Sequence, residues 1–295
     1  GKTLGIGNYD SANIIHSNGK FYLLVGTSTS NRDHFYIVDA KTLYYENSAV
    51  VGANLSGLTI LNEQYGLVTG DGIRRIDLKS LNNVRIKNER LLCFYNSIIY
   101  NGKVLSNDTY KDESKVKYYD VNELIAAKEG EAPAVTELDI IQKQKINFVL
   151  AKDGNVYTLE SADNGCNIVK IKNDFTLEKV FANFQPAKGP YHSSPTIGMV
   201  ASETENIIYL VSTDGAIYKY ILGDSDSLKA PFIAAESGVS ITAPLQLNQQ
   251  SGELYVTYTE ERKDESKIVV YSKDGKVLHT VDCGESVPSQ ILFNN

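Results

Sequence analysis

The sequence of 295 residues lacks tryptophan altogether and has only three cysteines, one methionine and four histidines. Three scattered cysteines, Cys93, Cys166 and Cys283, with no C-x-x-C pair, are too few for a disulfide framework. No apolar run approaches the roughly 18 to 20 residues that a membrane-spanning helix needs. The formal net charge of -7 argues against nucleic acid as a partner, because phosphates demand a basic surface. These shortages exclude disulfide-rich, membrane-spanning and nucleic-acid-binding proteins.

Motifs that carry known chemistry are also missing. The chain has no G-x-S-x-G elbow, no phosphate-binding G-x-x-x-x-G-K-[ST] and no H-E-x-x-H. No histidine stands three or four residues from another, so local metal-ligand spacing is absent. Asp224-Ser225-Asp226 is the nearest approach to a calcium loop and lacks the remaining ligands. We therefore expect neither a cofactor nor a metal.

What the sequence does contain is a motif that recurs six times, about every 40 to 50 residues. Each copy has a Gly/Asn-led strand followed by a second strand rich in Tyr, Val and Ile, which suit a pleated surface. The first of these strands, which is the second strand of its unit, is expected at 19–23, 65–68, 102–105, 154–157, 206–209 and 252–256. The strand after it, the third of the unit, is expected at 35–39, 73–77, 116–120, 168–171, 217–220 and 268–271. Repeats of this length indicate solenoids, propellers or arrays.

A shorter strand that opens on small residues precedes each copy. We expect these inner strands at 11–15, 56–60, 92–95, 146–149, 194–198 and 243–247. With a last apolar strand, each unit has four strands, which predicts an all-β fold: a single β-propeller of four-stranded antiparallel blades over residues 1–295. Six complete units favour six blades. A seventh inner strand at 288–293 keeps seven open and suggests that the C-terminus closes the ring beside residues 2–6.

Two local features have structural explanations. The Asp residues that end several strands, such as Asp39 and Asp77, are typical of turns, because their side chains bond to nearby backbone. Residues 121–129, rich in Ala, Glu, Leu and Lys, predict a short surface helix.

Long polar loops indicate where a ligand binds. In a propeller, the loops that enter the inner strands and the loops that join second to third strands share one face. Four of the latter are long here, at 27–33, 106–114, 161–165 and 260–266, and long loops on a rigid scaffold are where binding groups usually lie. On this face, Gly189–Pro195 places Tyr191, His192 and Ser193 near the mouth of the channel, a mixture that can stack on and hydrogen-bond to a ligand. The remaining candidate ligand-binding residues on this rim are Asp10, Asn13, Arg32, Tyr110, Asn164 and Arg262.

The copies at 35–43 (FYIVDAKTL) and 73–81 (IRRIDLKSL) resemble the V-x-V-I-D-x-x-T element of YVTN/YncE-like propellers. The Tyr-, Asn- and Lys-rich composition is similar to that of uncharacterised exported Bacteroidetes surface propellers. The absence of Trp speaks against the WD-repeat and quinoprotein branches. The resemblance implies an exported protein, in the periplasm or on the outer surface, attached there as a lipoprotein whose signal precedes residue 1. Some similar propellers capture cobalamin for an outer-membrane transporter.

Three functions remain open. The favoured one is a non-catalytic, monomeric binding protein for a small molecule or glycan, with cobalamin among the candidates. The second is a protein-interaction scaffold within a surface uptake complex that includes an outer-membrane partner. The third is a propeller hydrolase or lactonase, which would need carboxylates, a His or a metal gathered at the channel mouth.

Overall fold

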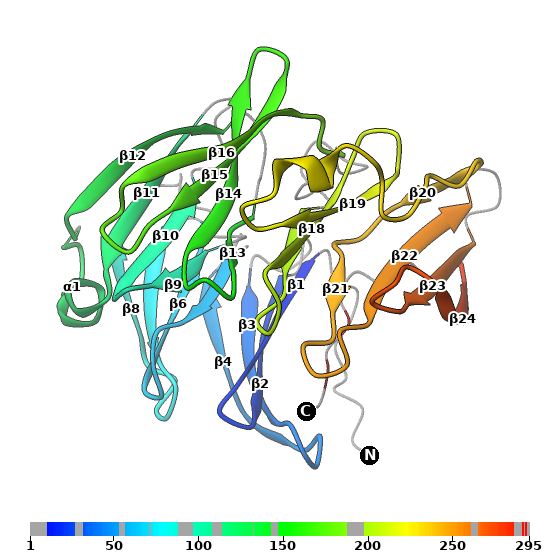
Figure 1. The fold of residues 1–295 in the computed structure, drawn as a ribbon. Coiled ribbons are helices and arrows are strands. Elements are labelled where there is room, and N and C mark those ends of the chain that lie inside the picture. Colours follow the sequence, from blue (N-terminus) through cyan, green and yellow to red (C-terminus); the bar gives the residue numbers. More distant parts are fainter. Residues whose placement is uncertain are drawn as a thin grey trace. The chain divides into compact units, whose positions relative to one another are not determined.

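A computed structural model gives the fold. The residues it describes are 11–26, 32–52, 57–70, 72–87, 97–107, 114–131, 133–142, 147–187, 198–260, 265–285, 291 and 293. The fold is an all-β, six-bladed β-propeller, as the repeats predict, and each blade is one antiparallel sheet (Figure 1). The chain divides into two compact units, Gly1–Lys143 and Gln144–Phe293, each with three of the sheets.

The first unit contains three four-stranded sheets. Sheet 1 consists of β1 (Ser11–Ser17), β2 (Lys20–Gly26), β3 (Asp33–Asp39) and β4 (Tyr45–Gly52). Sheet 2 consists of β5 (Gly57–Ile60), β6 (Tyr65–Thr69), β7 (Ile73–Asp77) and β8 (Asn83–Lys87). Sheet 3 consists of β9 (Ile98–Tyr100), β10 (Lys103–Asn107), β11 (Ser114–Asp120) and β12 (Val135–Gln142), with helix α1 (Val121–Ala126) after β11.

The second unit contains sheets 4 to 6. Sheet 4 consists of β13 (Val149–Leu150), β14 (Val156–Ala162), β15 (Gly165–Ile171) and β16 (Leu177–Phe184). Sheet 5 consists of β17 (Met199–Ala201), β18 (Ile207–Val211) and β19 (Ile217–Ile221), with an isolated bridge from Ile217 to Ile233 at its outer edge and the 3-10 helix η1 (Ser225–Leu228). Sheet 6 consists of β20 (Val239–Ile241), β21 (Gln246–Leu247), β22 (Leu254–Glu260), β23 (Ser266–Tyr271) and β24 (Val277–Gly284).

The predicted second and third strands of all six units are confirmed, whereas the inner strands are confirmed only in sheets 1 and 2. The inner strand of sheet 3 is β9, while the predicted 92–95 lies outside the described residues. In sheet 4 the inner strand begins at Val149, not at residue 146, and in sheet 5 it begins at Met199, just after the predicted span. In sheet 6 it is divided into β20 and β21, with Pro244, which has no N–H to donate, in the break. The seventh strand at 288–293 lies outside the described residues except for Ile291 and Phe293.

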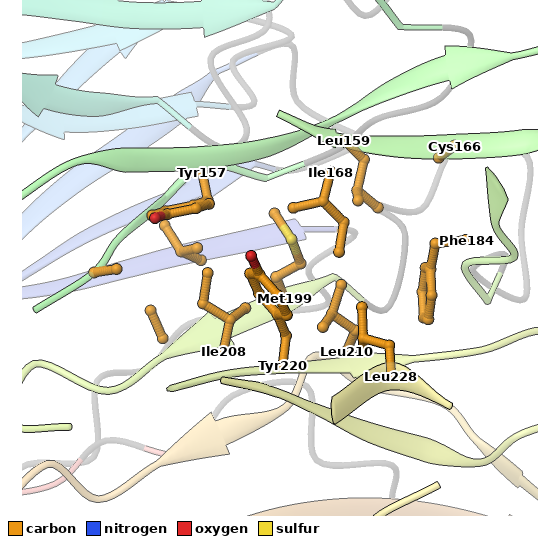
Figure 2. Packing of buried hydrophobic residues seen from close by; sticks show 13 residues of the cluster. Tyr157, Leu159, Cys166, Ile168, Phe184, Met199, Ile208, Leu210, Tyr220 and Leu228 are labelled. Carbon is orange, nitrogen blue, oxygen red and sulfur yellow. The ribbon is translucent and has the colours of Figure 1, made fainter. Parts of the chain in front are cut away.

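Neighbouring sheets within each unit pack face to face. One cluster of buried side chains joins sheets 1 and 2, and another joins sheets 2 and 3. In the second unit, clusters join sheets 4 and 5 and sheets 5 and 6. Figure 2 shows the cluster between sheets 4 and 5, where Met199 lies among Tyr157 and Ile168 from one sheet and Ile208 and Leu210 from the other. Fully burying such a side chain stabilises the fold by about 1.5 to 3 kcal/mol.

Candidate functional site

The candidate site lies at the end of each sheet where its second and third strands join, here called the loop face. The register places the start of the inner strand at that same end, because Ser11 pairs with Gly26 in sheet 1 and Gly57 pairs with Thr69 in sheet 2. The inner strands of these two sheets therefore begin at the loop face.

Three of the nine candidate residues belong to the described part of the chain. The other six, Asp10, Tyr110, Tyr191, His192, Ser193 and Arg262, lie outside it. Asn13 is half-buried in β1 opposite Leu24, and Arg32 is exposed immediately before β3. Both therefore lie toward the loop-face end of sheet 1. Asn164 belongs to the second unit, and the grouping of these three residues into one site stays a prediction.

Asn164 occupies a two-residue turn between β14 and β15, so the prediction of a long loop at 161–165 is wrong. Its backbone carbonyl accepts a hydrogen bond of 2.5 Å from Nε2 of Gln185, the residue that follows β16. The next residue, Gly165, has a φ of 119°, and a Cβ there would lie 2.4 Å from that same Nε2. This turn is consequently fixed by the side chain of Gln185, just after the outer strand of its own sheet, while the Asn164 side chain is exposed.

The segment with Tyr191 and His192 begins and ends at anchored positions. Before it, Ala187 N donates to Val211 O at 2.8 Å, and Thr213 N donates to Gln185 O at 2.9 Å. After it, the chain re-enters sheet 5 at Gly198, whose φ is 53°, and Met199, which pairs with Leu210. Both anchors lie beside the loop-face end of β18. The structure thus fixes where residues 188–197 leave and rejoin the scaffold.

A hairpin beside these anchors supplies polar groups. Between β18 and β19, Asp214 accepts hydrogen bonds from the Ser212 hydroxyl and, at 3.1 Å, from Ala216 N. These two hydrogen bonds, that of Ser212 above all, lower the pKa of the Asp214 carboxyl. An ionised carboxylate that already accepts such bonds is suited to hold a turn and poorly suited to act as a general base.

Charged residues lie in the interface between sheets 1 and 2, and sequence reasoning assigned them no role. Asp33 begins β3, is only 2 % exposed and lies on the same face of the strand as Phe35, which packs against sheet 2. Arg74 and Arg85 pair across β7 and β8 and share the face of sheet 2 on which Ile76 packs against sheet 1. Asp33 and Arg74 therefore lie on the facing sides of sheets 1 and 2, each within the first two residues of its strand at the loop-face end. In the sequence, Asp33 stands at the end of the predicted loop 27–33, and Arg74 lies inside the predicted strand 73–77.

Carboxylates at the opposite end of the sheets act in turns, as predicted. Asp39 Oδ1 accepts from the backbone N–H groups of Lys41 and Thr42, at 3.1 and 2.7 Å. Asp77 makes the equivalent bonds in sheet 2, and Asp120 caps the N-terminus of α1. Asp224 likewise accepts from Asp226 N and caps η1, so this Asp-Ser-Asp run forms a helix cap.

Neither metal-type clusters nor spanning helices occur in the part of the chain that the structure describes. No group of three or more His, Cys, Asp or Glu side chains within those residues is arranged to hold a metal ion. None of their helices combines the length and apolar character required to cross a membrane. Cys166 and Cys283, the two described cysteines, are both free.

Comparison with solved structures places this chain among known propellers. A functionally unknown protein from Desulfotomaculum acetoxidans is similar with a TM-score of 0.58 and 13 % identity, over 96 % of this chain and 89 % of that one. The β-propeller domain of Cps50 (Swd1) from Myceliophteria thermophila is similar with a TM-score of 0.56 and 12 % identity, over 95 % and 91 % of the two chains. Streptogramin B lyase is similar with a TM-score of 0.54 and 14 % identity, over 93 % and 84 %. At such identities the likeness concerns the fold alone.

Comparison of sequences gives a family. No curated protein matches the chain. The family model described as "Domain of unknown function (DUF5074)" matches residues 1–294, and the chain therefore belongs to that family.

Proposed function

We propose that this protein is a non-catalytic binding protein whose loop face holds a small molecule or a glycan. One observation carries the proposal: the segment 188–197, with its aromatic ring, imidazole and hydroxyls, leaves and rejoins sheet 5 at two backbone-anchored positions, Ala187 and Met199. A rigid frame reduces the entropy lost when a loop orders around a ligand. Asn13, Arg32 and Asn164, with Asp10, Tyr110 and Arg262, are proposed as further contacts.

The wider setting of the proposal comes from sequence resemblance. Similarity to YVTN/YncE-like and exported Bacteroidetes propellers supports a monomeric single-domain protein that acts in the periplasm or on the outer surface as a lipoprotein. There it would deliver its ligand to an outer-membrane uptake partner, and cobalamin is one candidate ligand by that resemblance.

The experiment is a thermal-shift screen of the wild-type protein against cobalamins, haem and a panel of free glycans. A ligand that binds only the native state stabilises it, by about 2.7 kcal/mol when the free ligand concentration is one hundred times Kd. This stabilisation raises the melting temperature. The double variant Tyr191→Ala/His192→Ala is expected to retain the unliganded melting temperature and to lose the shift.

The control is Tyr44→Ala/His279→Ala, which removes the same two ring types from exposed positions outside the loop face. This control should keep the full ligand-induced shift. A hit whose shift survives in the Tyr191/His192 variant would place the binding site elsewhere, and a large loss of unliganded stability in that variant would show the segment to be structural.

A further inference from the structure

The inner strand of sheet 5, β17, is held on both of its edges although it has only three residues. One edge pairs with β18 through Met199, Val200 and Ala201. The Met199 side chain is 4 % exposed and lies in the cluster between sheets 4 and 5 (Figure 2). Three residues of pairing with β18 do little to fix the register of so short a strand. The hydrogen bonds on its other edge therefore help to fix it.

At the loop-face end, that other edge is held by Asn147 of sheet 4. Asn147 Nδ2 donates to Met199 O at 2.6 Å, and Asn147 Oδ1 accepts from Met199 N at 2.9 Å. The amide thus bonds to the backbone of β17 as a neighbouring strand would. Thr158 Oγ1 donates to Asn147 O at 3.1 Å and so ties the Asn147 backbone to β14. Gly198 leaves room for this contact, because a Cβ there would lie 2.8 Å from Asn147 Oδ1.

At the opposite end, the same device comes from sheet 6. Gln249 Nε2 donates to Ala201 O at 3.0 Å, and Gln249 Oε1 accepts from Glu203 N at 2.8 Å. The two amides use the same chemistry at the two ends of one strand. Of these two side chains, Asn147 is the one that bonds to the end of β17 at which the chain returns from residues 188–197.

We propose that Asn147 is a positioning residue: it fixes the point at which the chain re-enters sheet 5 and thereby holds the end of the loop-face segment that includes His192. This inference rests on the proposed function for its biological meaning. Gln249 stabilises the same strand and has no such influence on the loop face.

The test compares Asn147→Asp with Gln249→Glu in the full chain. Each substitution replaces a donating NH₂ by an oxygen that faces a backbone carbonyl, so both are expected to speed amide exchange in β17 by about tenfold, the effect of one hydrogen bond. The second readout is the rate at which diethyl pyrocarbonate modifies His192, followed by peptide mass spectrometry. His16, His34 and His279 in the same sample serve as internal references.

Asn147→Asp is expected to change the His192 modification rate by about threefold or more, whereas Gln249→Glu leaves it unchanged. Asn147→Ser, which removes both bonds without adding charge, should behave as Asn147→Asp does and serves if the latter fails to fold. Equal His192 rates in the Asn147 and Gln249 variants would overturn the positioning role. Neither readout uses a ligand, so a failed compound screen rejects the proposed function and leaves this test intact.

Discussion

At the scale of single residues, the aspartates that recur at strand ends stabilise turns. The Asp39 and Asp77 turns each end on a leucine with positive φ, Leu43 at 57° and Leu81 at 59°. Leu81 is 6 % exposed and packs between sheets 1 and 2, so burial offsets the strain of its backbone. The Asp role was predictable, since Asx turns depend on neighbouring residues only. The conformation of Leu81 was not, because its packing contacts come from another sheet, whereas Leu43 adopts the same conformation with its side chain 69 % exposed.

Gly198 gives a prediction about close approach. Gly198→Ala forces an alanine to a φ of 53° and brings its Cβ against Asn147 Oδ1, so it should destabilise the fold by more than the roughly 1 to 2 kcal/mol of left-handed strain. Gly19→Ala is the matched control, because Gly19 has a φ of 69° with no atom within 4 Å of a Cβ. Urea unfolding measures the free energy of unfolding of both variants. Equal losses would show that Asn147 can move aside without cost.

Asp153 gives a prediction about pH. Its Oδ2 accepts from Tyr157 Oη and lies 2.9 Å from Lys170 Nζ. Burial alone would raise the pKa of this carboxyl, but its hydrogen bonds, that of Lys170 first, outweigh burial and lower the pKa.

A pKa lowered by folding contributes stability above the unfolded pKa, and that stability is lost as pH falls through the folded value. Between about pH 6 and pH 3, wild type should therefore lose more stability than Asp153→Asn, which cannot ionise. Melting temperatures across this range measure the difference. Parallel curves for the two proteins would contradict the role of Asp153.

At the scale of elements, α1 shows how tertiary contacts set boundaries. The composition predicts a helix over 121–129, and the structure ends it at Ala126. Arg75 of β7 donates through Nη1 to Ile125 O and, at 3.0 Å, to Ala127 O. These carbonyls lie at the helix C-terminus, where a cation is favoured by the helix dipole. A partner from the preceding sheet could not be read from local propensity.

Arg75 should therefore be sensitive to a conservative change. Its guanidinium also lies 5.3 Å from the centre of the Tyr65 ring, so Arg75→Lys loses both the planar fork and much of the stacking. We expect a loss of about 1 to 2 kcal/mol, with faster amide exchange in α1. Lys128→Ala, at an exposed cation just beyond the same helix, should change neither quantity. An Arg75→Lys protein as stable as wild type would show that charge alone suffices.

Inner strands mark the limit of sequence reading at this scale. The middle strands have runs of Tyr, Val and Ile that recur from unit to unit, and all of them were predicted. Inner strands such as β13 and β21 have two residues each, too few to form a recognisable run. Their positions depend on which residues of β14 and β22 they pair with, and on bonds such as those of Asn147.

At the scale of the whole molecule, the propeller could be predicted because its period repeats six times, and repetition compensates for the weakness of each copy. The candidate site occurs once in the sequence, so no second copy helps to tell binding residues from structural ones. The sequence pointed to a loop segment; the anchors at Ala187 and Met199 that frame it follow from long-range pairing. Six of the nine candidate residues lie outside the described residues, and their role stays a prediction.

The last prediction concerns the C-terminus. Phe293 lies with its ring centre 5.0 Å from that of Tyr255 in β22, in an edge-on arrangement. Tyr255 alternates with Leu254 and Val256, which pack against sheet 5, so Phe293 contacts the other face of sheet 6. Phe293→Ala should cost about 1 to 2 kcal/mol, since an aromatic contact and partial burial are both lost. Val277→Ala, an exposed position in the same sheet, should cost less than about 0.5 kcal/mol.

Removal of residues 288–295 tests whether the same segment closes the propeller. If it does, the truncated chain should lose more stability than Phe293→Ala, because backbone pairing of the closing strand disappears together with the ring contact. Urea unfolding followed by tyrosine fluorescence and by far-UV circular dichroism compares the three proteins. A truncated chain no less stable than Phe293→Ala would confine the contribution of the C-terminus to the contact between Phe293 and Tyr255, and would exclude it as the closing strand.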